Sequence, residues 1–146
     1  VSGLIRTEEV GNMASAVSGY MPVREKLVEL QKQLAAKENV IMDGRDIGTC
    51  VLPDAPAKIY LTASVEVRAV RRYKELLEKG MEADLKEIEK DIEDRDYRDM
   101  HREHSPLKQA EDAVLLDTSS MTLDQVVEEI LKIVREKGYK AAGGCA

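Results

Sequence analysis

Hydrophobic and polar positions alternate along the chain with two periods, one typical of amphipathic helices and one typical of buried strands. From Val23 to Leu34, apolar residues recur at every third or fourth position, which predicts a helix over about 23–37. Pro22 precedes it, and proline is well tolerated in the first turn of a helix. The stripe that this helix would bury consists of Val23, Leu27, Leu30 and Leu34.

Three further helices are predicted by end signals as well as by periodicity. Ser64 is a suitable cap for a helix through about Lys79, because Gly80 follows as a stop signal. A third helix carries Leu85, Ile88 and Ile92 and is limited by Ser105-Pro106. "TLDQ" at 122–125 is a capping box that opens a last helix. Its apolar stripe is Val126, Val127, Ile130, Leu131 and Val134.

Short runs of mostly apolar residues between these helices predict buried strands at 40–42, 57–61 and 114–116. Strands separated by helices favour an α/β fold, with a parallel sheet flanked by helices. In such folds, ligands bind beyond the carboxyl ends of the strands. The residues in that position after the first run are Asp43, Gly44, Arg45 and Asp46.

Composition limits the classes of partner. A chain of 146 residues fits one domain, and its net charge of −6 argues against binding to nucleic acid or acidic membranes. The two cysteines, Cys50 and Cys145, lie far apart in the sequence, which fits reduced thiols better than a disulfide or a zinc site. No apolar stretch approaches membrane length, so we expect a cytoplasmic protein.

The polar segment 43–46 is the first candidate site. Gly44 allows the backbone to approach a ligand closely, and Arg45 offers a planar fork for phosphate. The carboxylates of Asp43 and Asp46 can accept hydrogen bonds from amino or hydroxyl groups. A nucleotide would use all of these groups. A solvated turn with an Asp-Arg ion pair explains the same residues, and from them alone both interpretations stay open.

A second candidate is "EDRDYRDMHRE" at 93–103. On a helix Arg95, Asp99 and Arg102 share one face, and such converging arginines can bind phosphates and stabilise charge during phosphoryl transfer. A solvent-exposed ladder of Asp-Arg pairs is the alternative. His101 and His104 lack a third ligand, so we expect no metal site there.

The third candidate is the segment 6–27, where Ser15, Ser18 and Gly19 precede a helix that carries Arg24. A loop there would suit a small polar ligand, although an ordinary loop before a helix explains it equally well. The phosphate-binding motif G-x-x-x-x-G-K-[ST] is absent from these 146 residues, in which no glycine is followed by lysine.

Together these segments resemble bacterial cytidylate kinases, which phosphorylate CMP and dCMP with ATP. The resemblance rests on "SGLIRTEEVGNMAS", "MDGRDIGTCVLPDAPAKIYL", "RAVRRYKEL", "RDYRDMHREHSPL" and "AEDAVLLDTSSM", in that order and with similar separations. It covers almost the whole chain except about the last ten residues. The combination of "DGRDIGT" with "RDxRD" distinguishes this family from adenylate, guanylate and shikimate kinases, which share the fold.

The resemblance implies roles for individual residues. Ser15, Arg24 and Asp46 are similar to residues that read cytosine, and Arg45 is similar to one that holds the monophosphate. Asp99 resembles a residue that binds the ribose, with Arg95 and Arg102 beside the phosphates as catalytic residues together with Arg45. Arg71 and Arg72 resemble phosphate contacts of a mobile lid.

The resemblance also implies an organisation. The family has a three-layer P-loop kinase fold with a helical lid, and its P-loop and first strand precede the region matched here. We therefore expect the carboxyl-terminal two thirds of such a kinase, incomplete at the N-terminus and with little or no catalysis of its own. The expected parts are the end of the monophosphate-binding insertion at 1–22, the core at 23–67 and 107–138, the lid at 68–106 and a loose tail at 139–146.

The implied ligands are CMP, dCMP and ATP with Mg²⁺, although the residues that anchor ATP are missing from the sequence. A full-length protein is expected to be a monomer, while this chain alone is expected to self-associate through exposed sheet edges. A different class of function stays open, namely a non-catalytic nucleotide-binding or interaction module that keeps the pocket. Nucleic-acid binding through the arginine-rich helix is disfavoured, because alternating aspartates cancel its charge.

Overall fold

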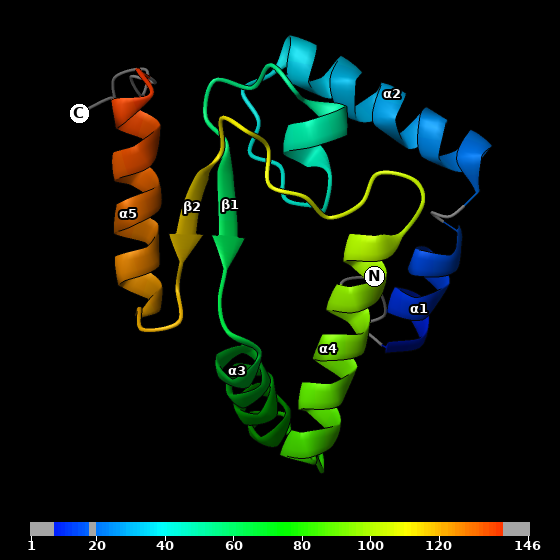
Figure 1. Cartoon of the computed structure of the whole chain (residues 1–146), viewed down its shortest axis with the longest axis vertical. Coiled ribbons are helices and arrows are strands. Elements are labelled where there is room, and N and C mark those ends of the chain that lie inside the picture. The colour runs from blue at the N-terminus through cyan, green and yellow to red at the C-terminus, as the bar shows by residue number, and fades with distance from the viewer. Residues whose placement is uncertain (1–7, 18–19, 139–146) are drawn as a thin grey trace. The chain divides into compact units, whose positions relative to one another are not determined.

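The structure, a computed structural model, describes residues 8–17 and 20–138 of the chain (Figure 1). Contacts divide the chain into two units, Val1–Asp43 and Gly44–Ala146, and each is described separately. The tail predicted at 139–146 lies outside the described residues, as do Ser18, Gly19 and Cys145.

The described part of the first unit contains two helices, α1 (Glu8–Val17) and α2 (Met21–Lys37). The prediction of a loop before the second helix is wrong over 8–17, because those residues form α1. The single glycine of that stretch, Gly11, does not prevent the helix. Helix α2 confirms the predicted helix over 23–37, with Pro22 in its first turn. The four residues of its apolar stripe are 38–50% exposed.

The predicted strand at 40–42 is not formed. Residues 39–43 belong to no helix or strand, and the side chain of Ile41 is fully exposed. A strand needs the backbone of a neighbour as well as apolar side chains. Within the described residues, the sheet consists of two other segments, which pair with each other.

The second unit is built on a parallel pair of strands, β1 (Ile59–Thr62) and β2 (Val114–Asp117). Ile59 lies opposite Val114 and Thr62 lies opposite Asp117. These strands confirm the predictions at 57–61 and 114–116 to within two residues at the ends. The observed fold is therefore α/β with a small parallel sheet.

Two helices connect the strands, α3 (Val65–Glu78) and α4 (Leu85–His101), and they pack against each other beyond the carboxyl ends of the strands (Figure 1). Ser64 caps α3 as predicted, and its hydroxyl accepts a hydrogen bond from the Val67 amide at 3.3 Å. Gly80, just past α3, has a positive φ of 71°, which glycine adopts without strain. Asp84 caps α4 by accepting bonds from two backbone amides.

The last helix, α5 (Leu123–Glu136), follows β2 after a short turn and runs back in the opposite direction (Figure 1). Its start confirms the capping box: the Thr122 hydroxyl accepts from the Gln125 amide at 3.3 Å, and the Gln125 side chain accepts from the Thr122 amide at 2.9 Å. Two backbone amides at the start of the helix, which have no carbonyl partner within it, thus receive side-chain hydrogen-bond acceptors.

Among the residues whose burial the structure describes, the buried side chains belong to the second unit. The buried hydrophobic residues are Val51, Ala63, Ala69, Leu116 and Ile133. Lys58 and Thr118 are buried polar residues, and both have hydrogen-bond partners. The Lys58 ammonium group donates to the Asp112 carboxylate at 2.8 Å and to the Pro53 carbonyl.

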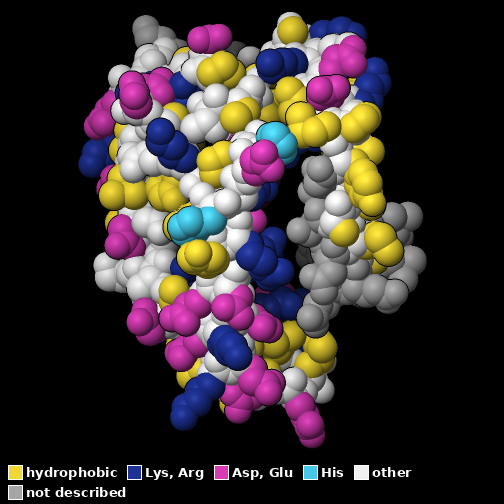
Figure 2. Space-filling view, turned by 45° about the vertical axis from the view of Figure 1, so that its right-hand side comes forward, with side chains coloured by type: hydrophobic (Ala, Val, Ile, Leu, Met, Phe, Trp, Pro, Cys, Tyr) yellow, Lys and Arg dark blue, Asp and Glu magenta, His cyan; other side chains and the backbone are white. Residues whose placement is uncertain are grey.

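Figure 2 shows hydrophobic and charged side chains mixed on one face of the molecule. The segment from the end of α3 to the start of α4 is rich in exposed acidic residues, namely Glu78, Glu82, Asp84 and Glu87. Among the described residues, no helix has the length and apolar character needed to cross a membrane.

The ion pair between Lys58 and Asp112 predicts a pH dependence of stability. A hydrogen bond from Lys58 lowers the pKa of Asp112 below its ordinary value of 3.8. A carboxyl group whose pKa is lowered by folding stabilises the protein above its unfolded pKa and loses that contribution as the pH falls through its folded pKa. Asp112→Asn is therefore expected to lower the urea midpoint at pH 7, and this difference should shrink as the pH drops below 3.8.

Urea unfolding of both proteins at several pH values would check this. Glu129→Gln, which removes one partner of an exposed pair on α5, serves as the control and should leave the midpoint nearly unchanged. An Asp112→Asn difference that stayed constant from pH 7 to pH 3 would contradict the linkage.

Candidate functional site

The polar segment 43–46 leads into a short helical turn, η2 (Ile47–Val51), whose hydrogen bonds have π-helical spacing. The Asp46 carbonyl accepts from the amides of Cys50 at 2.8 Å and Val51 at 3.2 Å. A Cβ atom at Gly44 would lie 2.9 Å from a side-chain carbon of Ile47, so a larger residue there would force a shift. Short π-helical turns of this kind occur frequently at functional sites.

Arg45 and Asp99 form an ion pair across 54 residues of sequence. The Arg45 Nε donates to a carboxylate oxygen of Asp99 at 2.8 Å, and the Asp99 side chain is only 20% exposed. The Nε atom of Arg95, one turn earlier on α4, lies 4.0 Å from the same oxygen. The structure therefore joins two separate sequence motifs into one cluster, the Arg45–Asp99–Arg95 cluster.

Arg102 does not share a helical face with this cluster as the sequence predicted. Helix α4 ends at His101, and Arg102 has extended backbone angles at the cap. Its Nε donates to the Ser105 carbonyl at 2.5 Å, and Ser105 has a positive φ of 49°. The Nη2 atom of Arg102 is buried and has no hydrogen-bond partner among the described residues. The spacing argument failed because it assumed that the helix continued through Arg102.

His101 is the last residue of α4, and His104 lies beyond the helix. His101 stacks on Tyr97 with ring centroids 4.1 Å apart, and its Nδ1 lies 2.8 Å from the Tyr97 carbonyl oxygen. In the part of the chain that the structure describes, no group of three His, Cys, Asp or Glu residues could hold a metal ion. Cys50 is a free thiol at the surface.

Ser15 and Arg24 belong to the first unit. Ser15 lies within α1, and Arg24 lies in the first turn of α2. Asp46, the third residue predicted to read cytosine, belongs to the second unit, at the start of η2. Their roles in base recognition stay a prediction.

Arg71 and Arg72, predicted to contact phosphates, have partners within the second unit. The Arg71 guanidinium donates to the Thr118 carbonyl at 2.6 Å and lies 3.4 Å from the Met121 carbonyl, just beyond β2. Arg72 bonds to Glu75 at 2.9 Å. Hydrogen bonds from Lys79 and then Arg72 lower the pKa of Glu75 to about 2.

Sequence reasoning missed Arg68. Its guanidinium donates to both carboxylate oxygens of Asp96, at 3.1 and 2.6 Å, and its Nε donates to the Ala63 carbonyl at 2.9 Å. These contacts join the end of β1, the first turn of α3 and the middle of α4. Arg68 and Asp96 stand 28 positions apart, so no local pattern could have paired them.

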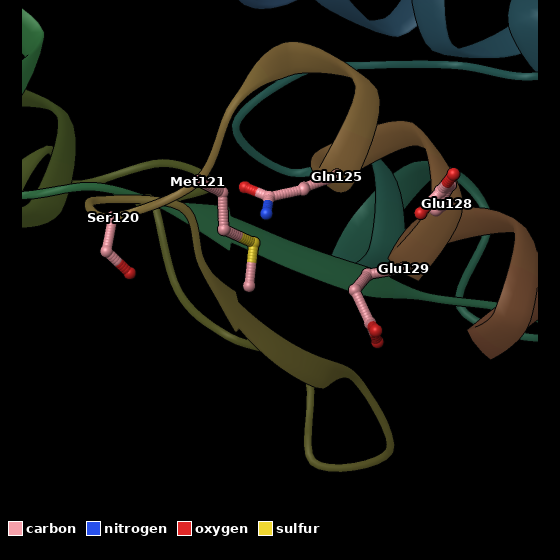
Figure 3. A pocket seen from close by; sticks show the side chains of 5 residues that line it. All are labelled: Ser120, Met121, Gln125, Glu128 and Glu129. Carbon is pink, nitrogen blue, oxygen red and sulfur yellow. The ribbon is translucent and has the colours of Figure 1, made fainter.

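A pocket of about 430 Å³ lies at the start of α5, and Figure 3 shows its side chains coming from the turn after β2 and from the helix. It is lined by Ser120, Met121, Gln125, Glu128 and Glu129. Gln125 also serves the capping box, and the pocket contains no cationic side chain for an anionic ligand.

A sequence model of the cytidylate kinase family matches residues 1–136. The match includes both segments of the Arg45–Asp99–Arg95 cluster. The chain belongs to the cytidylate kinase family. The match of the family model extends through α5 and ends at residue 136.

Curated members of the family show how close this similarity is. A cytidylate kinase of Lactobacillus johnsonii is 57% identical over 133 residues, which are 91% of this chain and 58% of the relative. One of Lactobacillus gasseri is 57% identical over 94% of this chain and 60% of the relative. One of Streptococcus pneumoniae is 57% identical over 86% of this chain and 56% of the relative. The chain therefore spans less than two thirds of the length of these relatives.

Proposed function

We propose that the chain carries the acceptor-nucleotide part of a kinase that transfers the γ-phosphate of ATP to CMP or dCMP, giving CDP or dCDP. The observation that supports this most directly is the Arg45–Asp99–Arg95 cluster, which combines guanidinium groups for a phosphate with a carboxylate for a hydroxyl. Family membership supplies the substrate class. The proposed fold of the whole protein is the three-layer P-loop kinase fold, with residues 68–106 as the lid.

Phosphate binding is proposed for Arg45, Arg95 and Arg102. Arg45 has further N–H groups besides the Nε that bonds to Asp99, and these can bind phosphate oxygens while the ion pair persists. Arg102 has a buried Nη2 atom without a hydrogen-bond partner among the described residues, and an anion would satisfy it. Positive groups held in place before the reaction stabilise charge on a transferred phosphoryl group.

Base and sugar recognition is proposed for the remaining residues. Cytosine presents O2 and N3 as acceptors and an amino group as a donor, so Arg24 and Ser15 would serve the acceptors and Asp46 the amino group. Uracil would present a carbonyl to Asp46 and be disfavoured. Asp99 is proposed to accept a hydrogen bond from a ribose hydroxyl in addition to the one from Arg45.

The residues present do not fit the ATP phosphates and Mg²⁺. These 146 residues contain no G-x-x-x-x-G-K-[ST] motif, and the described part has no cluster of three potential metal ligands. We therefore expect this chain alone to show no turnover. The region before 23 is proposed as part of the monophosphate-binding insertion, and 23–67 with 107–138 as the core.

Calorimetric titration of the chain with CMP, UMP and AMP in parallel tests the proposal. Selective binding of CMP is expected, because cytosine offers an amino donor to Asp46 together with O2 and N3 as acceptors, whereas uracil has a carbonyl in place of that donor and adenine has no carbonyl acceptor. Asp46→Ala is expected to reduce CMP affinity more than it reduces the melting temperature.

Equal affinities for the three nucleotides, or no binding by a folded chain, would contradict the proposed acceptor site in this chain. If a longer protein that includes a P-loop bound CMP tightly without turnover, a non-catalytic nucleotide-binding module would replace the kinase.

A further inference from the structure

We infer that Arg68 and Asp96 are positioning residues that hold α4 in the rotation that places Asp99 against Arg45. The inference rests on the proposed function, because its consequence for ligands concerns the proposed phosphate site. The three groups involved, the Arg68 guanidinium, the Asp96 carboxylate and the Ala63 carbonyl, are called the Arg68 bridge.

The Arg68 bridge is well suited to fix orientation. Arg68 presents two parallel N–H groups to Asp96 at 3.1 and 2.6 Å and a third to Ala63 at 2.9 Å. A bidentate arginine pair restricts angle as well as distance. The side chains are partly buried, with 33% of Arg68 and 25% of Asp96 exposed. Ala63 itself is buried at the end of β1, so the bridge connects α4 to a fixed point of the sheet.

The proposed site lies one helical turn away. Asp96 and Asp99 are three positions apart on α4, which places them on neighbouring rows of the helix about 4.5 Å apart along its axis. Because a helix turns as a unit, the rotation that brings Asp96 to Arg68 also decides where Asp99 and Arg95 point. The Asp99 carboxylate then receives Arg45 from a distant segment at 2.8 Å.

A second contact, made by Arg71, attaches α3 to the segment that follows β2. Arg71, one turn after Arg68 on α3, donates to the Thr118 carbonyl at 2.6 Å beyond β2. Helix α3 is therefore tied to the ends of both strands, and the Arg68 bridge extends this attachment to α4. The carbonyl of Asp99 also accepts from the Leu107 amide at 2.7 Å, which holds the end of α4. The experiment must therefore separate the bridge from this backbone contact.

The test observes the ion pair directly in the free chain. In NMR spectra the Arg45 Nε–H signal is assigned by its loss in Arg45→Lys, and its hydrogen exchange is measured in wild type, Asp96→Asn and Arg68→Lys. Asn keeps the size of Asp without its charge, while Lys keeps the charge without the fork. We expect exchange of the Arg45 Nε–H to become about 2- to 30-fold faster in both variants, the range for a residue acting through a neighbour.

The control is Asp112→Asn, the same chemical change in another long-range ion pair, with Lys58. It should leave Arg45 exchange unchanged. The double variant Arg68→Lys with Asp96→Asn should exchange no faster than the single variants, because both remove one bridge. If Asp96→Asn does not fold, Arg68→Lys decides the question.

Unchanged hydrogen exchange of the Arg45 Nε–H in the folded variants would overturn the inference. It would indicate that the backbone contact with Leu107, and not the Arg68 bridge, holds Asp99 in position. Equal acceleration in Asp112→Asn would also overturn it, by showing general loosening.

CMP titration of the same proteins separates this inference from the proposed function. A wild-type chain that binds no CMP contradicts the acceptor site, while Arg45 exchange still decides the role of the bridge.

Discussion

Replacement of Arg45 by alanine is expected to weaken CMP binding by about 10- to 150-fold, because a hydrogen bond to a charged group contributes about 1.5–3 kcal/mol. The expected loss has two sources. The variant removes a guanidinium group proposed to contact the phosphate, and it leaves the Asp99 carboxylate, which is 20% exposed, without its nearest cation. Arg95 is 4.0 Å away and 66% exposed, so it compensates only in part.

Calorimetry with CMP and with cytidine would check this prediction. Cytidine lacks the phosphate, so its affinity should fall much less in Arg45→Ala than that of CMP. Arg135→Ala, an exposed residue in the last turn of α5, is the matched control for charge and should bind both ligands as wild type does. An equal loss of CMP and cytidine binding would show that Arg45 acts on the fold of the site instead of on the phosphate.

Replacement of Leu116 by alanine is expected to lower the free energy of unfolding by about 2–5 kcal/mol, the usual cost of removing a buried leucine side chain. Leu116 lies in β2 opposite Leu61 and is 7% exposed. Its neighbour Leu115 lies in the same strand on the opposite face and is 56% exposed. Leu115→Ala should therefore cost well under half as much, although the two changes are chemically identical.

Urea unfolding followed by circular dichroism would compare the two variants, and fluorescence is less useful because the chain has no tryptophan. Similar losses in both variants would contradict the assignment of the buried face of β2. They would also imply that another element covers Leu115.

Local patterns predicted the elements of the second unit well, because the signals for those elements lie within a few residues of one another. Ser64 and Gly80 indicated both ends of α3, and Thr122 with Gln125 indicated the start of α5. The prediction failed where formation of an element depends on a partner that is distant in the sequence. Val40 to Met42 has the composition of a buried strand, but no described strand pairs with it.

The sequence also predicted several residues of the candidate site, although spacing along the chain could not show that they lie together. Arg45, Arg95 and Asp99 were predicted on two separate motifs, and the structure brings all three together. Arg102 was expected on the same helical face, but α4 ends one residue before it. Helix ends depend on tertiary contacts such as the bond between the Leu107 amide and the Asp99 carbonyl, which periodicity does not contain.

The amino-acid sequence by itself determined the α/β class, the helix boundaries marked by caps, and, through the motifs around Arg45 and Asp99, the resemblance to cytidylate kinases. Only the tertiary structure decided that Arg45 contacts Asp99 and that Arg68 joins Asp96 to the end of β1. The reason is physical: caps and periodicity act over one or two helical turns, whereas these ion pairs span 54 and 28 positions. Such contacts form only when packing of the intervening sheet and helices brings their ends together.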